Sequence, residues 1–140
     1  MATTAQYSTS PTLDVSQIST ANTNRDGSGT TVEIAAGPTS AAASGVGKRI
    51  MGVQVKATGT TTAGMIRFFL STDGGTTKRL VDEICVIAVT PSATQTAWVG
   101  TASNIQNLIL PGQVSSNTQK LYAATEKAET FNVFVYGATY

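Results

Sequence analysis

The chain has 140 residues and a formal net charge of +1, only 12% of its residues are charged, and it contains no histidine. This length predicts one domain, and a near-neutral charge without any Lys/Arg cluster of more than two residues argues against nucleic acid or an anionic membrane as partner. The absence of histidine removes the side chain best matched to acid–base catalysis at neutral pH, so we expect neither an enzyme nor a cofactor.

The first thirty residues are polar and low in complexity. Leu13, Val15 and Ile18 are sparse apolar positions among serines, threonines and asparagines. Such a stretch buries too little apolar surface to order itself. We therefore expect residues 1–30 to form an extended N-terminal arm that lies against the domain or a neighbouring subunit, and residues 31–140 to form the folded domain.

Alternating apolar residues predict a series of strands after the arm. Asp73, Gly74 and Gly75 predict a tight hairpin, because they allow the positive φ angles that such turns require. A short helix, if present, is expected at 102–108 or 16–21. About eight strands at this spacing predict an all-β, single-domain β-sandwich or barrel. The expected strands lie at 31–35, 49–57, 65–71, 78–89, 98–99, 105–110, 120–125 and 130–136.

Two of these strands carry more specific expectations. In 49–57, the period of two places Met51 on the same face as Val53, Val55 and Ala57. The strand at 78–89 is largely apolar towards its end, which predicts a central strand that is covered on both faces. Cys85 lies in this apolar run and is the only cysteine. We therefore expect a small buried side chain without an intrachain disulfide.

One loop matches the spacing of a calcium-binding loop. Asn22, Asn24 and Asp26 occupy its first, third and fifth positions, Gly27 the sixth and Glu33 the twelfth. Oxygen ligands at these positions could surround a calcium ion. The first position is Asn where a charged ligand is favoured, and no helices are predicted to flank the loop. The alternative interpretation is a turn rich in Asn, Asp and Gly, with Glu33 in a strand.

Trp98 is the single tryptophan and has two interpretations. An exposed Trp can stack on a sugar or a base, whereas a Trp between Ala97 and Val99 is more commonly an anchor in a core or an interface. A carbohydrate-binding β-sandwich module that uses Trp98, Tyr122 or Tyr136 therefore remains an alternative.

Four runs resemble the sequences of small virion proteins of tailed bacteriophages: ATGTTTAGMIRFFLS at 57–71, AVTPSAT at 88–94, LPG at 110–112 and KAETFNV at 127–133. The resemblance implies a single jelly-roll or β-sandwich domain that decorates the outside of the capsid. It also implies that the protein is made in the host cytoplasm and located in the virion at the capsid surface. The implied partners are the major capsid protein and copies of the same chain, arranged as a homotrimer.

The residues and the resemblance together predict a structural virion protein that works by contact. The first hypothesis is a capsid decoration (cement) protein that binds and stabilises the phage head lattice. The alternatives are a tail, head–tail joining or fibre-associated virion protein, and the carbohydrate-binding module. The candidate partner-binding residues are apolar and aromatic side chains of the arm, the tryptophan and the last residue, namely Tyr7, Leu13, Val15, Ile18, Trp98 and Tyr140.

Overall fold

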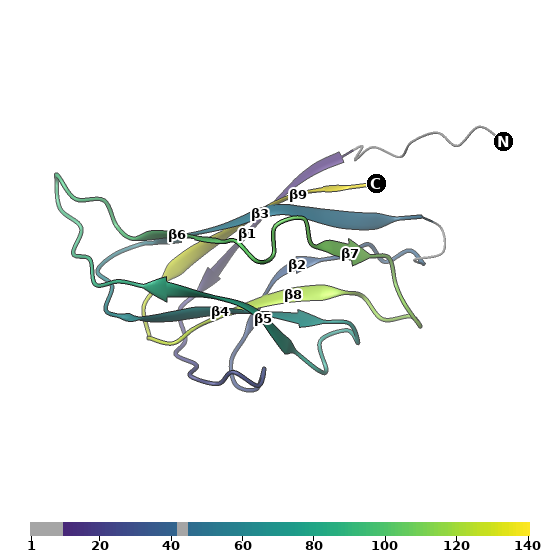
Figure 1. The fold of residues 1–140 in the computed structure, drawn as a ribbon, viewed down its shortest axis with the longest axis horizontal. Coiled ribbons are helices and arrows are strands. Elements are labelled where there is room, and N and C mark those ends of the chain that lie inside the picture. The colour runs from purple at the N-terminus through teal and green to yellow at the C-terminus, as the bar shows by residue number, and fades with distance from the viewer. Residues whose placement is uncertain (1–9, 42–44) are drawn as a thin grey trace.

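Antiparallel pairing organises the chain into two sheets that pack face to face (Figure 1). The computed structural model describes residues 10–41 and 45–140, which contain nine strands and no helix. The five-stranded sheet consists of β1 (Ser10–Ile18), β9 (Phe131–Thr139), β3 (Gly47–Ala57), β6 (Val99–Ala102) and β7 (Ile109–Pro111). The four-stranded sheet consists of β2 (Val32–Ala36), β8 (Lys120–Thr125), β4 (Gly64–Ser71) and β5 (Arg79–Val86).

The order of the strands is that of a jelly roll. In the five-stranded sheet the order is β1-β9-β3-β6, and in the four-stranded sheet it is β2-β8-β4-β5. Both β6 and β7 pair with β3, β6 along Val53–Lys56 and β7 along Gly47–Arg49, so together they act as one interrupted edge strand. Counted in this way, there are eight strands, and each connection crosses from one sheet to the other except that between β4 and β5, as in a double Greek key. The predicted β-sandwich of jelly-roll type is confirmed.

The core lies between the sheets and follows the period-two pattern of the strands. Phe68 of β4 and Phe131 of β9 are fully buried together with branched aliphatic side chains from both sheets. Trp98 is also buried, and its ring packs edge to face on Phe131 with 5.8 Å between the ring centroids. The prediction of Trp98 as a partner-binding residue is therefore wrong, because this large apolar ring closes the core beside β6 and β9.

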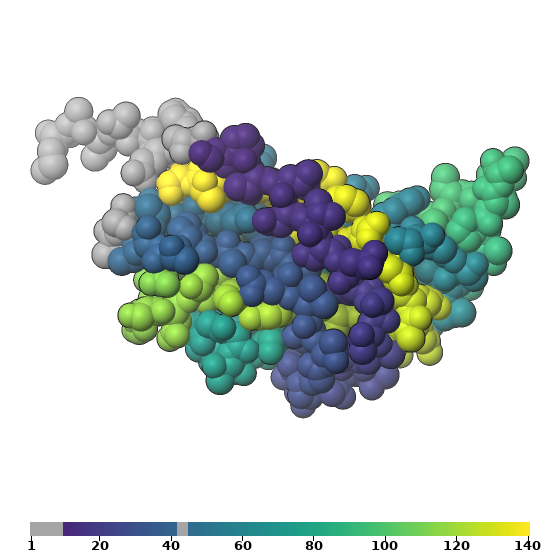
Figure 2. All heavy atoms as spheres, turned by 180° about the vertical axis from the view of Figure 1, so that it is seen from behind, coloured from purple at the N-terminus to yellow at the C-terminus, as the bar shows by residue number. Residues whose placement is uncertain are grey.

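The N-terminal arm is shorter than the sequence predicts. Residues 10–18 form β1, which pairs with β9 through nine consecutive residues and lies at the edge of the sandwich. Figure 2 shows this strand uncovered at the surface of the molecule. Backbone pairing with β9 and burial of Ile18 hold a segment whose own apolar content is low. Residues 1–9, including Tyr7, lie outside the described residues.

A bulge in β3 corrects the predicted face of Met51. The pairing of β3 with β9 shifts by one residue between Ile50 and Gly52. Because an extra residue reverses the direction of the side chains that follow, Ile50 is buried with Val53 and Val55, whereas Met51 points to solvent. The prediction that Met51 shares a face with Val53 is wrong for this reason.

The strand predicted over 78–89 is an edge strand, not a central one. β5 ends at Val86 and pairs only with β4 among the described strands. Ile84 and Val86 face the core, while Cys85 between them points outward and is exposed. The expected burial of Cys85 is wrong, since the side chain points to the outer face of the sheet, where it remains exposed.

The predicted hairpin at residues 72–76 is present. Gly74 and Gly75 adopt φ angles of 78° and 106°, which join β4 to β5. Asp73 stabilises the turn by accepting hydrogen bonds from the Thr77 amide and the Ser71 hydroxyl. The Thr77 amide is the main reason that the pKa of Asp73 falls to about 2, with the Thr77 and Ser71 side chains adding to it.

The burial of Trp98 gives a test of the core. We expect Trp98→Ala to lower the free energy of unfolding by about 3–5 kcal/mol, because it leaves a cavity against Phe131. Ile87→Ala, at a position that is 61% exposed, should change it by less than about 0.5 kcal/mol. Urea unfolding followed by far-ultraviolet circular dichroism measures both. Equal effects of the two substitutions would contradict this assignment of the core.

Candidate docking face

The outer face of the four-stranded sheet is partly covered by the chain itself. The segment 19–31, which joins β1 to β2, lies against β4, β5 and β8, and its Asn22 amide donates to the carbonyl of Thr125 at 2.8 Å. On the same face, Phe69 is fully buried and packs with Tyr122, Ala124 and Leu80 as a second small apolar cluster. Among the described residues, none of the exposed large hydrophobic side chains belongs to the four strands of this sheet.

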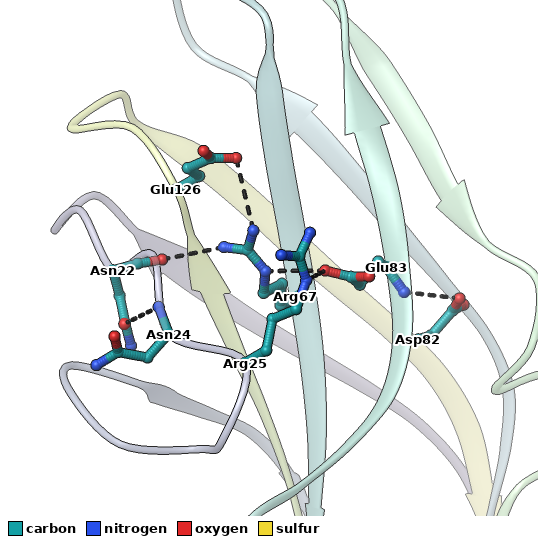
Figure 3. A network of polar contacts seen from close by, with 7 residues as sticks. All are labelled: Asn22, Asn24, Arg25, Arg67, Asp82, Glu83 and Glu126. Carbon is teal, nitrogen blue, oxygen red and sulfur yellow. Dashed lines mark hydrogen bonds and ion pairs between the residues drawn. The ribbon is translucent and has the colours of Figure 1, made fainter.

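A network of ion pairs fastens this segment to the sheet (Figure 3). The side chain of Arg67 on β4 is 3% exposed, and its Nε lies 2.9 Å from Glu83 Oε1 on β5. Its other nitrogens reach Glu126 Oε2 at 3.6 Å and the carbonyl of Asn22 at 3.3 Å. Arg25, from the covering segment, makes a second 2.9 Å contact with Glu83. The two arginines and the two glutamates of this network pair with one another, so we assign the network a role in holding the fold.

The pKa of Glu83 reflects its position between two arginines. Partial burial alone would raise the pKa of its carboxyl. Hydrogen bonds and positive charges from Arg25 and Arg67 outweigh burial and hold the pKa below the usual value of 4.5. A carboxylate whose pKa is lowered on folding stabilises the folded state above its unfolded pKa, and this stabilisation is lost as the pH falls through the lowered value.

Glu83→Gln tests this network. We expect it to lower the free energy of unfolding at pH 7 by about 1–3 kcal/mol, because a buried guanidinium loses its charged partner. The difference from the wild type should be full at pH 7 and should narrow as the pH falls from the unfolded pKa of about 4.3 through the lowered folded pKa, because the wild-type carboxyl then takes up a proton. The control is Glu33→Gln, which breaks an exposed pair with Lys120 and should cost less than about 1 kcal/mol. A stability difference that is the same at pH 7 and pH 3 would contradict the assignment.

The residues of the predicted calcium loop serve the folding of the covering segment. Asn22 donates from Nδ2 to the carbonyls of Ser28 and Thr30 and accepts from the amide of Asn24 with Oδ1. Asp26 accepts from the amide and the hydroxyl of Ser28, and these hydrogen bonds lower its pKa.

Glu33 lies on β2 and pairs with Lys120 at 3.0 Å. Across residues 10–41 and 45–140, no three His, Cys, Asp or Glu side chains come together in a way that could hold a metal ion. The calcium hypothesis remains a prediction, and no contact supports it.

The outer face of the five-stranded sheet, which we call the bare face, carries exposed apolar side chains. In the described residues, eight large hydrophobic side chains are exposed, and six of them lie on these strands with 44–61% of their surface accessible. The six are Leu13 and Val15 on β1, Met51 on β3, Val99 on β6, Ile109 on β7 and Tyr136 on β9.

The strand register joins the central part of this face into a strip. Leu13 lies opposite Tyr136, which in turn lies opposite Gly52 next to Met51. Two residues further along β1, on the same face, Val15 lies opposite Phe134. Side chains opposite one another on one face of a sheet are about 5 Å apart and in contact. A Cβ on Gly52 would meet nothing within 4 Å, so the surface beside Met51 is open.

Charges are sparse on the bare face. Among the outward residues of these five strands, Arg49 and Lys56 are charged and no carboxylate is present. Arg49 donates to Asn107 Oδ1 and Lys56 to the carbonyl of Ala97, so both cations have partners in the chain. Asp14 on β1 faces the other way and pairs with buried Lys48. The face is therefore suited to contact with an apolar surface.

The predicted partner-binding residues divide between the bare face and the interior. Leu13 and Val15 are on the bare face, but Ile18 is 1% exposed because β1 turns it into the core. Tyr140 is half-buried and exchanges two backbone hydrogen bonds with Gly47, so it closes the sheet beside β3. Ile18 as a docking residue is a wrong prediction.

The sequence did not point to Met51, Val99 or Ile109 as docking residues. Val99 and Ile109 could have been found from the alternation of their short strands, in which buried residues lie close to them. No sequence signal could have found Met51, because its direction depends on the bulge in β3. The carbohydrate-binding alternative loses two of its three aromatic rings, because Trp98 and Tyr122 are both buried.

Comparison with protein-family models, with curated proteins and with solved structures gives no significant match to this chain. Nowhere in the part of the chain that the structure describes is there a helix with the length and apolar character needed to cross a membrane.

Proposed function

We propose that this chain is a structural virion protein, a capsid decoration protein that attaches to the phage head lattice through the bare face. The observation that carries the proposal is the concentration of exposed apolar side chains on the bare face, while none of the exposed large hydrophobic side chains of the described residues belongs to the strands of the four-stranded sheet. Contiguous exposed apolar surface on a small domain is typical of a protein-binding site. The resemblance to small phage virion proteins supplies the identity of the partner, the major capsid protein.

A rigid domain with one apolar face suits attachment to a repetitive surface. The jelly roll holds the strands of the bare face by backbone pairing, so little ordering is needed when a partner binds. Many copies on one lattice gain by avidity where neighbouring copies also touch. A protein of the phage tail, or one that joins the phage head to the tail, would use the same face. A density map of the particle distinguishes these two locations from the capsid surface.

The attachment face can be tested by placing a charge at its centre. We expect Met51→Lys to reduce occupancy on particles that lack the protein at least tenfold, equivalent to about 1.4 kcal/mol, because the ammonium would be desolvated in an apolar contact. Ile87→Lys is the matched control, since Ile87 and Met51 are both 61% exposed and Ile87 lies outside the bare face. Co-sedimentation with purified heads, quantified by gel densitometry, measures occupancy.

Wild-type occupancy for Met51→Lys, or an equal loss for Ile87→Lys, would overturn the proposal. Point substitutions are preferred to removal of the N-terminal residues, because β1 belongs to the sandwich and its deletion would uncover Ile18.

A further inference from the structure

The edge strands of the two sheets are not equally protected against pairing with a strand of another molecule. Among the described strands, four edges are open to solvent: β1, β2, β5 and the interrupted β6–β7 edge. β2 has five residues and a register shift between Glu33 and Ala35. β5 has a register shift in its pairing with Phe68 and Phe69 of β4, and it carries charged side chains. Residues 103–108 interrupt the β6–β7 edge. Irregular, short or charged edges resist pairing with another strand.

β1 is the longest and most regular of these edges. It pairs with β9 over nine residues without a register shift, and it exposes Leu13 and Val15. Its one charged side chain, Asp14, faces inward and is paired with Lys48. A hollow of about 360 Å³ lies beside the strand, lined by residues 13–16 of β1, residues 33–36 of β2, and Lys48. In Figure 2 no other described segment covers β1.

The hydrogen-bond pattern identifies which backbone groups of β1 are free. Tyr140 exchanges both of its backbone hydrogen bonds with Gly47 of β3. Because these bonds alternate between the two sides of a strand, Thr139 points towards β1, where it pairs with Ser10. Continuing this alternation, even-numbered residues of β1 bond to β9, and Leu13, Val15 and Gln17 direct their N–H and C=O groups to the open edge. Pro11 fits this assignment, since its missing N–H falls on the open side.

We propose that this open edge pairs with the same edge of a second copy, antiparallel across a two-fold axis, so that two five-stranded sheets become one continuous sheet. Two-fold symmetry, in which the same surface of both copies meets, is the commonest symmetry among complexes of identical chains. The pairing joins two bare faces into one surface. The inference concerns contact between copies and holds whether or not the proposed capsid partner is correct.

The side chains of β1 favour a register centred on Val15 over one centred on Asp14. Centred on Val15, the pairing sets Val15 against Val15 of the second copy and Leu13 against Gln17, so all three free residues on each strand form hydrogen bonds. On the inner face Asp14 then lies opposite Ser16. Centred on Asp14, the pairing would set two aspartates opposite one another, which is unfavourable, and would match Gln17 with Pro11, which cannot donate.

Proline at position 15 tests the edge without breaking the β1–β9 ladder. The Val15 N–H faces the open side, so Val15→Pro removes a donor of the proposed contact alone. Val15→Thr keeps both the donor and the side-chain shape and is the matched control. Analytical ultracentrifugation of the full chain, without particles, should show a dimer for the wild type. We expect Val15→Pro to raise the dimer dissociation constant at least tenfold and Val15→Thr to change it less than about threefold.

A disulfide test keeps the proposal falsifiable if Val15→Pro disturbs the fold. In the Val15-centred register, the two Val15 Cα atoms lie about 5.5 Å apart, which a disulfide can span. In a Cys85→Ser background, Val15→Cys should therefore cross-link into dimers under mild oxidation. Gln17→Cys should not, because the two positions 17 lie on opposite sides of the axis.

Three results would overturn the proposal. They are a monomer throughout the accessible concentration range, a trimer whose stability Val15→Pro does not change, or equal cross-linking by Val15→Cys and Gln17→Cys. Loss of capsid binding by Met51→Lys is measured separately on particles, so failure of the edge contact and failure of the attachment face remain distinguishable.

Discussion

The structure depends on the antiparallel pairing of β9 with β1 on one side and with β3 on the other. β9 comes from the end of the chain, β1 from its beginning, and all nine of its residues pair with β1. This one strand places Phe131, Val133 and Val135 in the core and presents Phe134 and Tyr136 outward. Both the interior and the bare face are therefore built on the hydrogen bonds of β9, which tie together segments that are more than a hundred residues apart in sequence.

The two outer faces of the sandwich are treated differently by the chain. The four-stranded sheet receives segment 19–31, whose Arg25 pairs with Glu83 and whose Asn22 carbonyl accepts a hydrogen bond from Arg67. The five-stranded sheet receives no such cover from the described residues, and its apolar side chains remain in water. This difference between the two faces is the basis of the proposed contact with another protein. The low charge of the whole sequence, 12%, is consistent with this use.

The edge strand β1 connects this face to assembly. Leu13 and Val15 belong to the bare face through their side chains and to the open edge through their backbone groups. The same residues would thus serve both the proposed lateral contact between copies and the proposed facial contact with a partner. Both contacts rest on apolar burial and backbone hydrogen bonds, which need neither a histidine nor a metal ion. The missing histidine is accordingly compatible with a protein that acts through its surfaces.

The sequence by itself determined the fold class, because period-two alternation in segments such as 130–136 and the Asp73–Gly75 turn depends on neighbouring residues only. It also indicated Leu13 and Val15 as available apolar side chains. The tertiary structure decided the rest, since the fate of a side chain depends on strands that are distant in sequence. The bulge opposite Tyr136 turned Met51 outward, β9 recruited residues 10–18 into the sheet, and the packing of Phe131 drew Trp98 inside. Local pattern gives each strand two faces, and only the partner strands determine which of them is covered.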